Sequence, residues 1–152
     1  MPYTSAEARQ ELLDALSAVT DDIGVALGAL GDAYEQLDEV TADHLEDLLF
    51  APVQAAYGRA KRTQSEFADR HGMARPASAT APPGAPSRGV RAFVDTAVDA
   101  VQRADTSLAA LQDSLMPVEV GDAELRAGMA EVRRQLAGVP ASAREVVRRL
   151  GR

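Results

Sequence analysis

Two histidines are the side chains here with the greatest potential for metal chemistry. A carboxylate-bridged metal centre in a helical bundle needs Glu-x-x-His pairs, because one helical turn places those two ligands side by side. Thr41 stands three residues before His44 and Ala68 stands three before His71, so neither histidine has that glutamate. On one continuous helix the two imidazoles are roughly 40 Å apart. We therefore predict no metal site, a surface position for His44, and for His71 an interaction with the carboxyl end of its helix.

Two pairs of acids have the i, i+4 spacing that places carboxylates on one face of a helix, Glu35 with Glu39 and Asp43 with Asp47. The calcium-loop pattern Asp-x-Asp-x-Asp-Gly is absent, so we interpret these side chains as solvated acids. The chain also lacks Cys and the glycine motifs of hydrolases, phosphate loops and dinucleotide-binding folds. We therefore predict that the protein is not an enzyme and has no cofactor.

Three glycines fall within the first helical pattern, at Gly24, Gly28 and Gly31. A glycine in a helix interior costs about 1 kcal/mol relative to alanine, so some other interaction has to compensate. We expect a neighbouring helix to approach closely along these positions. The alternative is a groove that receives a helix of another protein.

The first helix is predicted to begin near residue 5, after the capping box Thr4-x-x-Glu7, and to continue to about residue 38. A second helix begins after Thr41 and stops at Gly72, and Pro52 should bend or break it around Phe50. These two helices form the first hairpin, over about 5–72. Residues 73–86 read MARPASATAPPGAP and are predicted to be a flexible linker.

A third helix is predicted to begin at a Ser87 cap and to end at Pro117. Asp122 then caps a fourth helix, which continues until Gly138 and Pro140. A second capping box, Ser142-x-x-Glu145, predicts the start of a short terminal helix. The second hairpin and this helix occupy 87–152.

The composition agrees with a small all-α protein. The chain has 152 residues, is 46% hydrophobic and only 4% aromatic, and contains no Trp. A core built from Leu, Val and Ala favours closely packed helices. We predict an antiparallel four-helix bundle built from two αα-hairpins with a short extra C-terminal helix, forming one domain over 1–152.

No apolar stretch reaches the roughly 20 residues of a membrane span, and no signal peptide is recognised. We expect a cytoplasmic protein, of bacterial origin because its cations are almost all Arg.

Charge is distributed unevenly along the sequence. Residues 1–72 carry a net charge of −9 and residues 73–152 of +2, which gives the acidic total of −7. Assuming an up-down-up-down bundle, we expect the acids around the first turn and those around the second, including Asp122 and Glu124, to form one acidic pole. The cations would gather at the opposite pole, where the C-terminal segment contributes Arg144, Arg148 and Arg149.

These observations favour a non-catalytic helical-bundle protein that works through protein–protein contacts, as an adaptor, scaffold or assembly component. The partner is another protein or a second copy of the chain, as in a homodimer. One alternative is a bundle that binds a small apolar ligand between its hairpins. Another is docking of an anion through the Arg-rich C-terminal segment, although nucleic acid is disfavoured because no basic patch is interleaved with aromatics. The candidate partner surfaces are Gly24, Gly28, Gly31, Glu35, Glu39, Asp43, Asp47, Arg144, Arg148 and Arg149.

Overall fold

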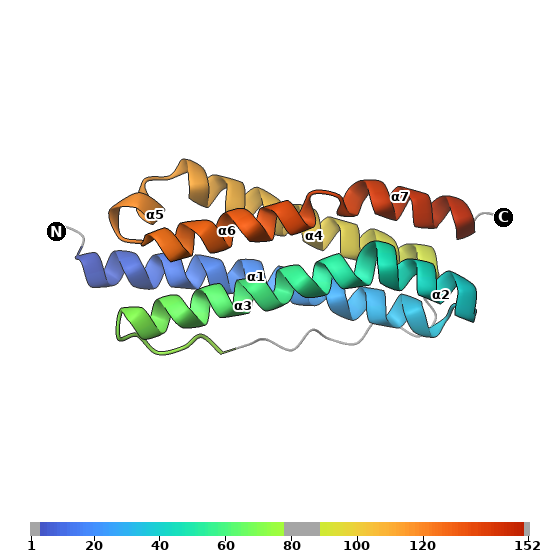
Figure 1. The fold of residues 1–152 in the computed structure, drawn as a ribbon, viewed down its shortest axis with the longest axis horizontal. Helices are drawn as coiled ribbons and strands as arrows, with labels where there is room; N and C mark the ends of the chain where they lie inside the picture. Colours follow the sequence, from blue (N-terminus) through green and yellow to red (C-terminus); the bar gives the residue numbers. More distant parts are fainter. Residues whose placement is uncertain (1–3, 78–88, 151–152) are drawn as a thin grey trace.

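A computed structural model describes residues 4–77 and 89–150, and within these ranges the chain is helical with no strand (Figure 1). The all-α prediction is confirmed. No helix in the described ranges is long and apolar enough to cross a membrane.

The first helix, α1, spans Ser5–Glu35 and begins with the predicted capping box. The Glu7 amide donates to the Thr4 hydroxyl at 3.1 Å, and the Thr4 amide donates to the Glu7 carboxylate at 3.1 Å. Both amides lack a partner within the helix, so the reciprocal pair stabilises this end. The helix ends three residues earlier than predicted, because Asp38 caps the next helix.

The second predicted helix is divided into three parts. These are α2 (Glu39–Leu45), the π-helical segment η1 (Glu46–Phe50) and α3 (Ala51–Arg70). The start at Glu39, rather than after Thr41, follows from the Asp38 carboxylate, which accepts from the Thr41 amide at 2.9 Å. Pro52 has no N–H to continue the α-helical ladder, and a π-helical turn ends just before it. The backbone stays helical at Phe50 and Ala51, so the ladder is disturbed at the predicted place but the helix is not broken. Gly72 terminates the segment with φ +65°, as predicted.

The second half contains α4 (Val90–Asp113), the single turn α5 (Met116–Glu119), α6 (Ala123–Leu136) and α7 (Val139–Leu150). Asp122 caps α6 as predicted, accepting from the Leu125 amide at 2.8 Å. The predicted end of the third helix at Pro117 is wrong, since α4 stops at Asp113 and Pro117 is buried in α5.

Two helices begin differently from the prediction. Gly89, rather than the predicted Ser87, caps α4, and Ser87 lies outside the described residues. The Ser142–Glu145 capping box is wrong, because the Ser142 amide already donates to the carbonyl of Gly138 inside α7. Pro140 does not end a helix; it lies in the first turn of α7, where no N–H is needed.

The predicted linker over 73–86 is described only in part. Residues 73–77 are not helical, and Arg75 forms an ion pair with Asp69 at 2.6 Å. The rest of the predicted linker lies outside the described residues.

The long helices lie side by side around a shared apolar core. Helix α1 packs against α4 and α3, α3 packs against α6, and α7 packs against α4 and η1. In Figure 1, α3 and α4 run in the same direction, opposite to α1 and α6. Many of the buried residues are alanines, including Ala26, Ala56, Ala97 and Ala104, and these small side chains allow the helices to approach closely.

The predicted single acidic pole is wrong. Arg9, near the start of α1, donates to the Val120 carbonyl at 3.2 Å, so the second turn lies beside the beginning of α1. The first turn follows the opposite end of α1, and Arg149 of α7 reaches it there by donating to His44 at 3.2 Å. The cations of α7 and the acids of the first turn therefore share one end of the molecule, because α4 runs parallel to α3 rather than antiparallel to it.

Candidate interaction groove between α4 and α7

The three glycines of α1 do not share one close neighbour. A Cβ at Gly24 would lie 3.3 Å from the Tyr57 ring on α3. At Gly31 no heavy atom lies within 4 Å of the Cβ position, and Gly28 is exposed. The expected helix along all three positions is therefore not present.

The closest helix approach at a glycine lies elsewhere, at Gly128 of α6. A Cβ at this position would meet the Thr63 side chain of α3, with Thr63 Cγ2 at 2.7 Å and its Cβ at 3.0 Å. Both residues are buried, so the missing side chain lets α3 and α6 come together. An isolated glycine inside a helical pattern was the available signal for this contact.

The four acids predicted as a partner surface, Glu35, Glu39, Asp43 and Asp47, are exposed on the end of α1, on α2 and on η1. In the described part of the chain, no group of three or more His, Asp or Glu side chains is placed to hold a metal ion. His44 is only half-buried and accepts from Arg149, while Arg149 also pairs with Glu145 at 3.3 Å. The other histidine, His71, contacts Asp122 rather than a helix carbonyl.

Asp122 forms a polar link between the end of α3 and the start of α6. Its carboxylate accepts two bonds from Arg70, both at 2.8 Å, one from His71 at 3.0 Å and one from the Leu125 amide. Burial by itself would raise the pKa of Asp122, but these donors outweigh it and lower the pKa to about 2. Arg70 and His71 join the end of α3 to Asp122, and the Leu125 amide fixes Asp122 as the cap of α6, so we interpret the cluster as structural.

A second polar cluster is buried in the core between α1 and α3. The Thr20 hydroxyl lies 2.9 Å from the Leu16 carbonyl oxygen and 3.0 Å from Gln64 Oε1. Thr20 is 3% exposed and Gln64 is 2% exposed. The adjoining cavity, which Thr20, Thr63 and Met129 line among others, has a volume of only about 10 Å³. This is no more than one water molecule needs, so a small apolar ligand enters between the hairpins only if they open.

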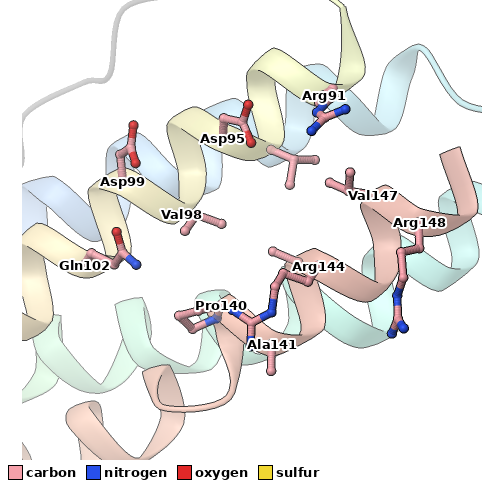
Figure 2. Close-up of a pocket in the computed structure, with 12 residues that line it drawn as sticks. Arg91, Asp95, Val98, Asp99, Gln102, Pro140, Ala141, Arg144, Val147 and Arg148 are labelled. Carbon is pink, nitrogen blue, oxygen red and sulfur yellow. The ribbon is translucent and has the colours of Figure 1, made fainter. Parts of the chain in front are cut away.

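An open groove lies between the first half of α4 and α7. Its volume is about 880 Å³ (Figure 2). It forms because α6 ends at Leu136 and the chain resumes as α7 at Val139, so that α7 follows its own path over α4. Twelve residues line it: Arg91, Val94, Asp95, Val98, Asp99, Gln102, Pro140, Ala141, Ala143, Arg144, Val147 and Arg148.

The floor of the groove is apolar. Val94 and Ala143 are buried, and Val98 and Val147 are half-buried between them. These residues recur at i, i+4 on α4 and on α7, which is the spacing that places side chains on one face of a helix. The buried Val94 and Ala143 pack α7 against the bundle, and the half-buried Val98 and Val147 leave apolar surface accessible from the groove.

The two rims of the groove carry opposite charges. Asp95 and Asp99 project from α4, and Arg144 and Arg148 from α7, with Arg91 at one end (Figure 2). All five are exposed, and no hydrogen bond or ion pair joins any of them to another residue in the described ranges. By contrast, Asp105 and Arg133 nearby are paired at 2.8 Å. The groove therefore presents an apolar floor between an unpaired acidic edge and an unpaired basic edge.

Part of this groove could be predicted from the sequence. Arg144 and Arg148 were predicted as a partner surface, whereas Asp95 and Asp99 were not. Their i, i+4 spacing beside the apolar stripe of α4 was the available signal. That they line one groove together with residues of α7 depends on how the two helices pack, which the apolar pattern of each helix alone does not determine.

The chain was also compared with known proteins. No family model, no curated protein and no solved structure matches it.

Proposed function

We propose that this antiparallel four-helix bundle is a non-catalytic protein that acts through protein–protein contacts, as an adaptor, scaffold or assembly component. The observation that carries the proposal is the groove between α4 and α7. It combines accessible apolar side chains with charged rims that have no partner within the described chain. An apolar centre surrounded by polar groups is typical of surfaces that bind proteins.

The environments of the acidic side chains also favour a contact function over catalysis. Asp122 is the acid whose pKa is most strongly displaced, and its donors are occupied in joining α3 to α6. The acids that line the groove, Asp95 and Asp99, are exposed to solvent.

A photo-crosslinking experiment in the cells of the source organism tests the proposal. A crosslinking amino acid would replace Gln102 or Ala141, which are exposed and line the groove. Matched control positions are Gln54 of α3 and Ala18 of α1, which are equally exposed but do not line it. We expect both groove positions to crosslink to the same protein, identified by mass spectrometry, and the controls not to do so.

Two outcomes would count against the proposal. If groove and control positions crosslink to the same scatter of proteins, the groove is not a binding surface. If native mass spectrometry of the protein isolated from its own cells shows an added small mass, the apolar-ligand alternative is favoured.

A second candidate function, docking of an anionic partner, has one observation in its favour. Arg144 and Arg148 are exposed and unpaired in the described structure, although Arg149 is already engaged with His44 and Glu145. Two carboxylates on the opposite rim oppose a purely anionic partner.

A further inference from the structure

We infer that the partner enters the α4/α7 groove as an amphipathic helix, with basic residues along one flank of its apolar stripe and acidic residues along the other. The inference rests on the proposed function and adds the chemistry of the partner. Three observations support it: the length of the groove, the charges on its two rims, and the lack of an exposed apolar stripe on the described helices of the chain.

The shape of the groove fits one helix. Grooves between two packed helices are filled by the ridge of a third, with anchors at i, i+3, i+4 and i+7. Along α4 the groove extends from Arg91 to Gln102, and at 1.5 Å per residue this is roughly 17 Å, or about three helical turns. An extended strand would find no edge to pair with, because the walls are helices with satisfied backbones.

The charges of the rims define the flanks of the bound helix. A helix lying on Val98 and Val147 has one flank beside the carboxylates of Asp95 and Asp99, which favours Lys or Arg there. Its other flank lies beside Arg144 and Arg148, which favours Asp or Glu. A helix with the same charge on both flanks is repelled at one rim.

A second copy of the chain does not provide such a helix. The exposed large apolar side chains of the described residues are Tyr34, Val40, Leu115 and Val118. These four residues do not form a stripe on one helix, because Tyr34 is in the last turn of α1, Val40 is in α2, and Leu115 and Val118 are at the single turn α5. Residues 78–88 contain three prolines and no large apolar side chain, so this segment does not provide the stripe either.

The charge pattern also determines the direction of binding. Reversing a helix while keeping its apolar stripe on the floor exchanges its two flanks. A peptide with Lys on one flank and Glu on the other therefore binds in one direction, and the peptide with these flanks exchanged binds in the opposite direction.

The test uses four synthetic peptides of two heptads, each with Leu at positions a and d and a fluorophore at one end. Two peptides carry Lys and Glu at positions e and g in either order, one carries only Glu there and one carries only Lys. We expect both mixed peptides to bind the full chain with similar Kd by fluorescence anisotropy. The uniform peptides should bind about fivefold more weakly, since each loses favourable pairs at one exposed rim.

Charge reversal in the protein sharpens the test, because the changed residues are exposed and should not disturb folding. With D95K/D99K both rims become basic, so we expect the all-Glu peptide to become the tightest binder and the mixed peptides to weaken. The matched control is E11K/D14K on α1, which changes the net charge equally at two exposed residues away from the groove. Circular dichroism would verify that both variants fold.

The outcomes separate this inference from the proposed function. An unchanged order of peptides in D95K/D99K, or the same change in E11K/D14K, would overturn the inference. If none of the four peptides binds while Gln102 and Ala141 still crosslink to a protein, the helical partner is wrong and the contact function stands. If the groove positions capture no protein in cells, the proposed function fails regardless of the peptides.

Discussion

Thr63 of α3 packs directly on Gly128 of α6, and its side chain occupies the volume that a Cβ at position 128 would need. This contact joins the two halves of the chain in the core. It also explains why a residue that weakens helices lies in the middle of α6.

We predict that Gly128→Ala destabilises the protein by about 1–3 kcal/mol, because the buried Thr63 side chain has to move to avoid overpacking. The matched control is Gly31→Ala, where no atom lies within 4 Å of the new methyl group. That change should stabilise the protein by about 0.5–1 kcal/mol through helix propensity. Urea denaturation measures both effects, and equal signs at the two positions would contradict the packing argument.

The double variant Thr63→Ala/Gly128→Ala should be more stable than the sum of the two single changes, because the clash is removed with the threonine side chain. A double-mutant cycle measures this coupling. Strict additivity would mean that the two side chains do not compete for the same space.

We predict that Asp122→Asn lowers the stability at neutral pH by about 1–2 kcal/mol, since it removes a charge that binds Arg70 and His71. Asparagine still caps α6, so the loss reports the charge rather than the cap. The pKa of Asp122 is lowered to about 2 in the folded protein, from an ordinary value near 3.8. Between these values the unfolded chain binds the extra proton, so the stability that Asp122 contributes is present above pH 4 and is lost as the pH falls toward 2.

The pH dependence distinguishes this effect from a general loss of packing. Thermal unfolding of the native protein from pH 2 to 5 should show a steeper rise in Tm than unfolding of Asp122→Asn. Asp38→Asn is the control, because Asp38 is also a helix cap with a lowered pKa, but the cause is hydrogen bonds from Thr41 rather than a cation. Parallel curves for the native protein and Asp122→Asn would contradict the assignment.

We predict that Thr20→Val destabilises the protein by about 1–3 kcal/mol, because it leaves the buried Gln64 Oε1 without the hydroxyl that donates to it. The shape of the side chain is almost unchanged, so the cost comes from the unsatisfied polar group. The double variant Thr20→Val/Gln64→Leu should recover part of the loss. Chemical denaturation measures each variant, and a neutral Thr20→Val would indicate that Gln64 finds another partner.

The triple variant Arg144→Gln/Arg148→Gln/Arg149→Gln is expected to fold with a stability within about 0.5 kcal/mol of the native protein. These side chains are exposed, and pairs at the surface contribute little. Any salt-sensitive binding of a partner at the α7 rim should be abolished. Unchanged binding, measured over a range of ionic strength, would exclude this rim from the interface.

The local features of the fold could be predicted from the sequence alone. The Thr4–Glu7 capping box, the Asp122 cap, the disturbed helical ladder before Pro52 and the stop at Gly72 depend on residues within one or two turns of one another. The free N–H and C=O groups at a helix end form hydrogen bonds with residues close by in the sequence, so short sequence patterns are enough to predict where a helix begins or ends. The Ser142–Glu145 box failed because Pro140 already suits the first turn of a helix that begins at Val139.

The order in which the helices meet was decided only by the tertiary structure. Residues 71–89 can span roughly 60 Å when extended, and α3 is about 30 Å long. The connection is therefore long enough for α4 to begin at either end of α3, and only the fit of the apolar faces selects between them. That choice separated the acids of the two turns, brought Arg149 to His44 and placed the valines of α7 over α4. The residues of the groove were thus present in the sequence as two unrelated helix faces, and packing alone made them one surface.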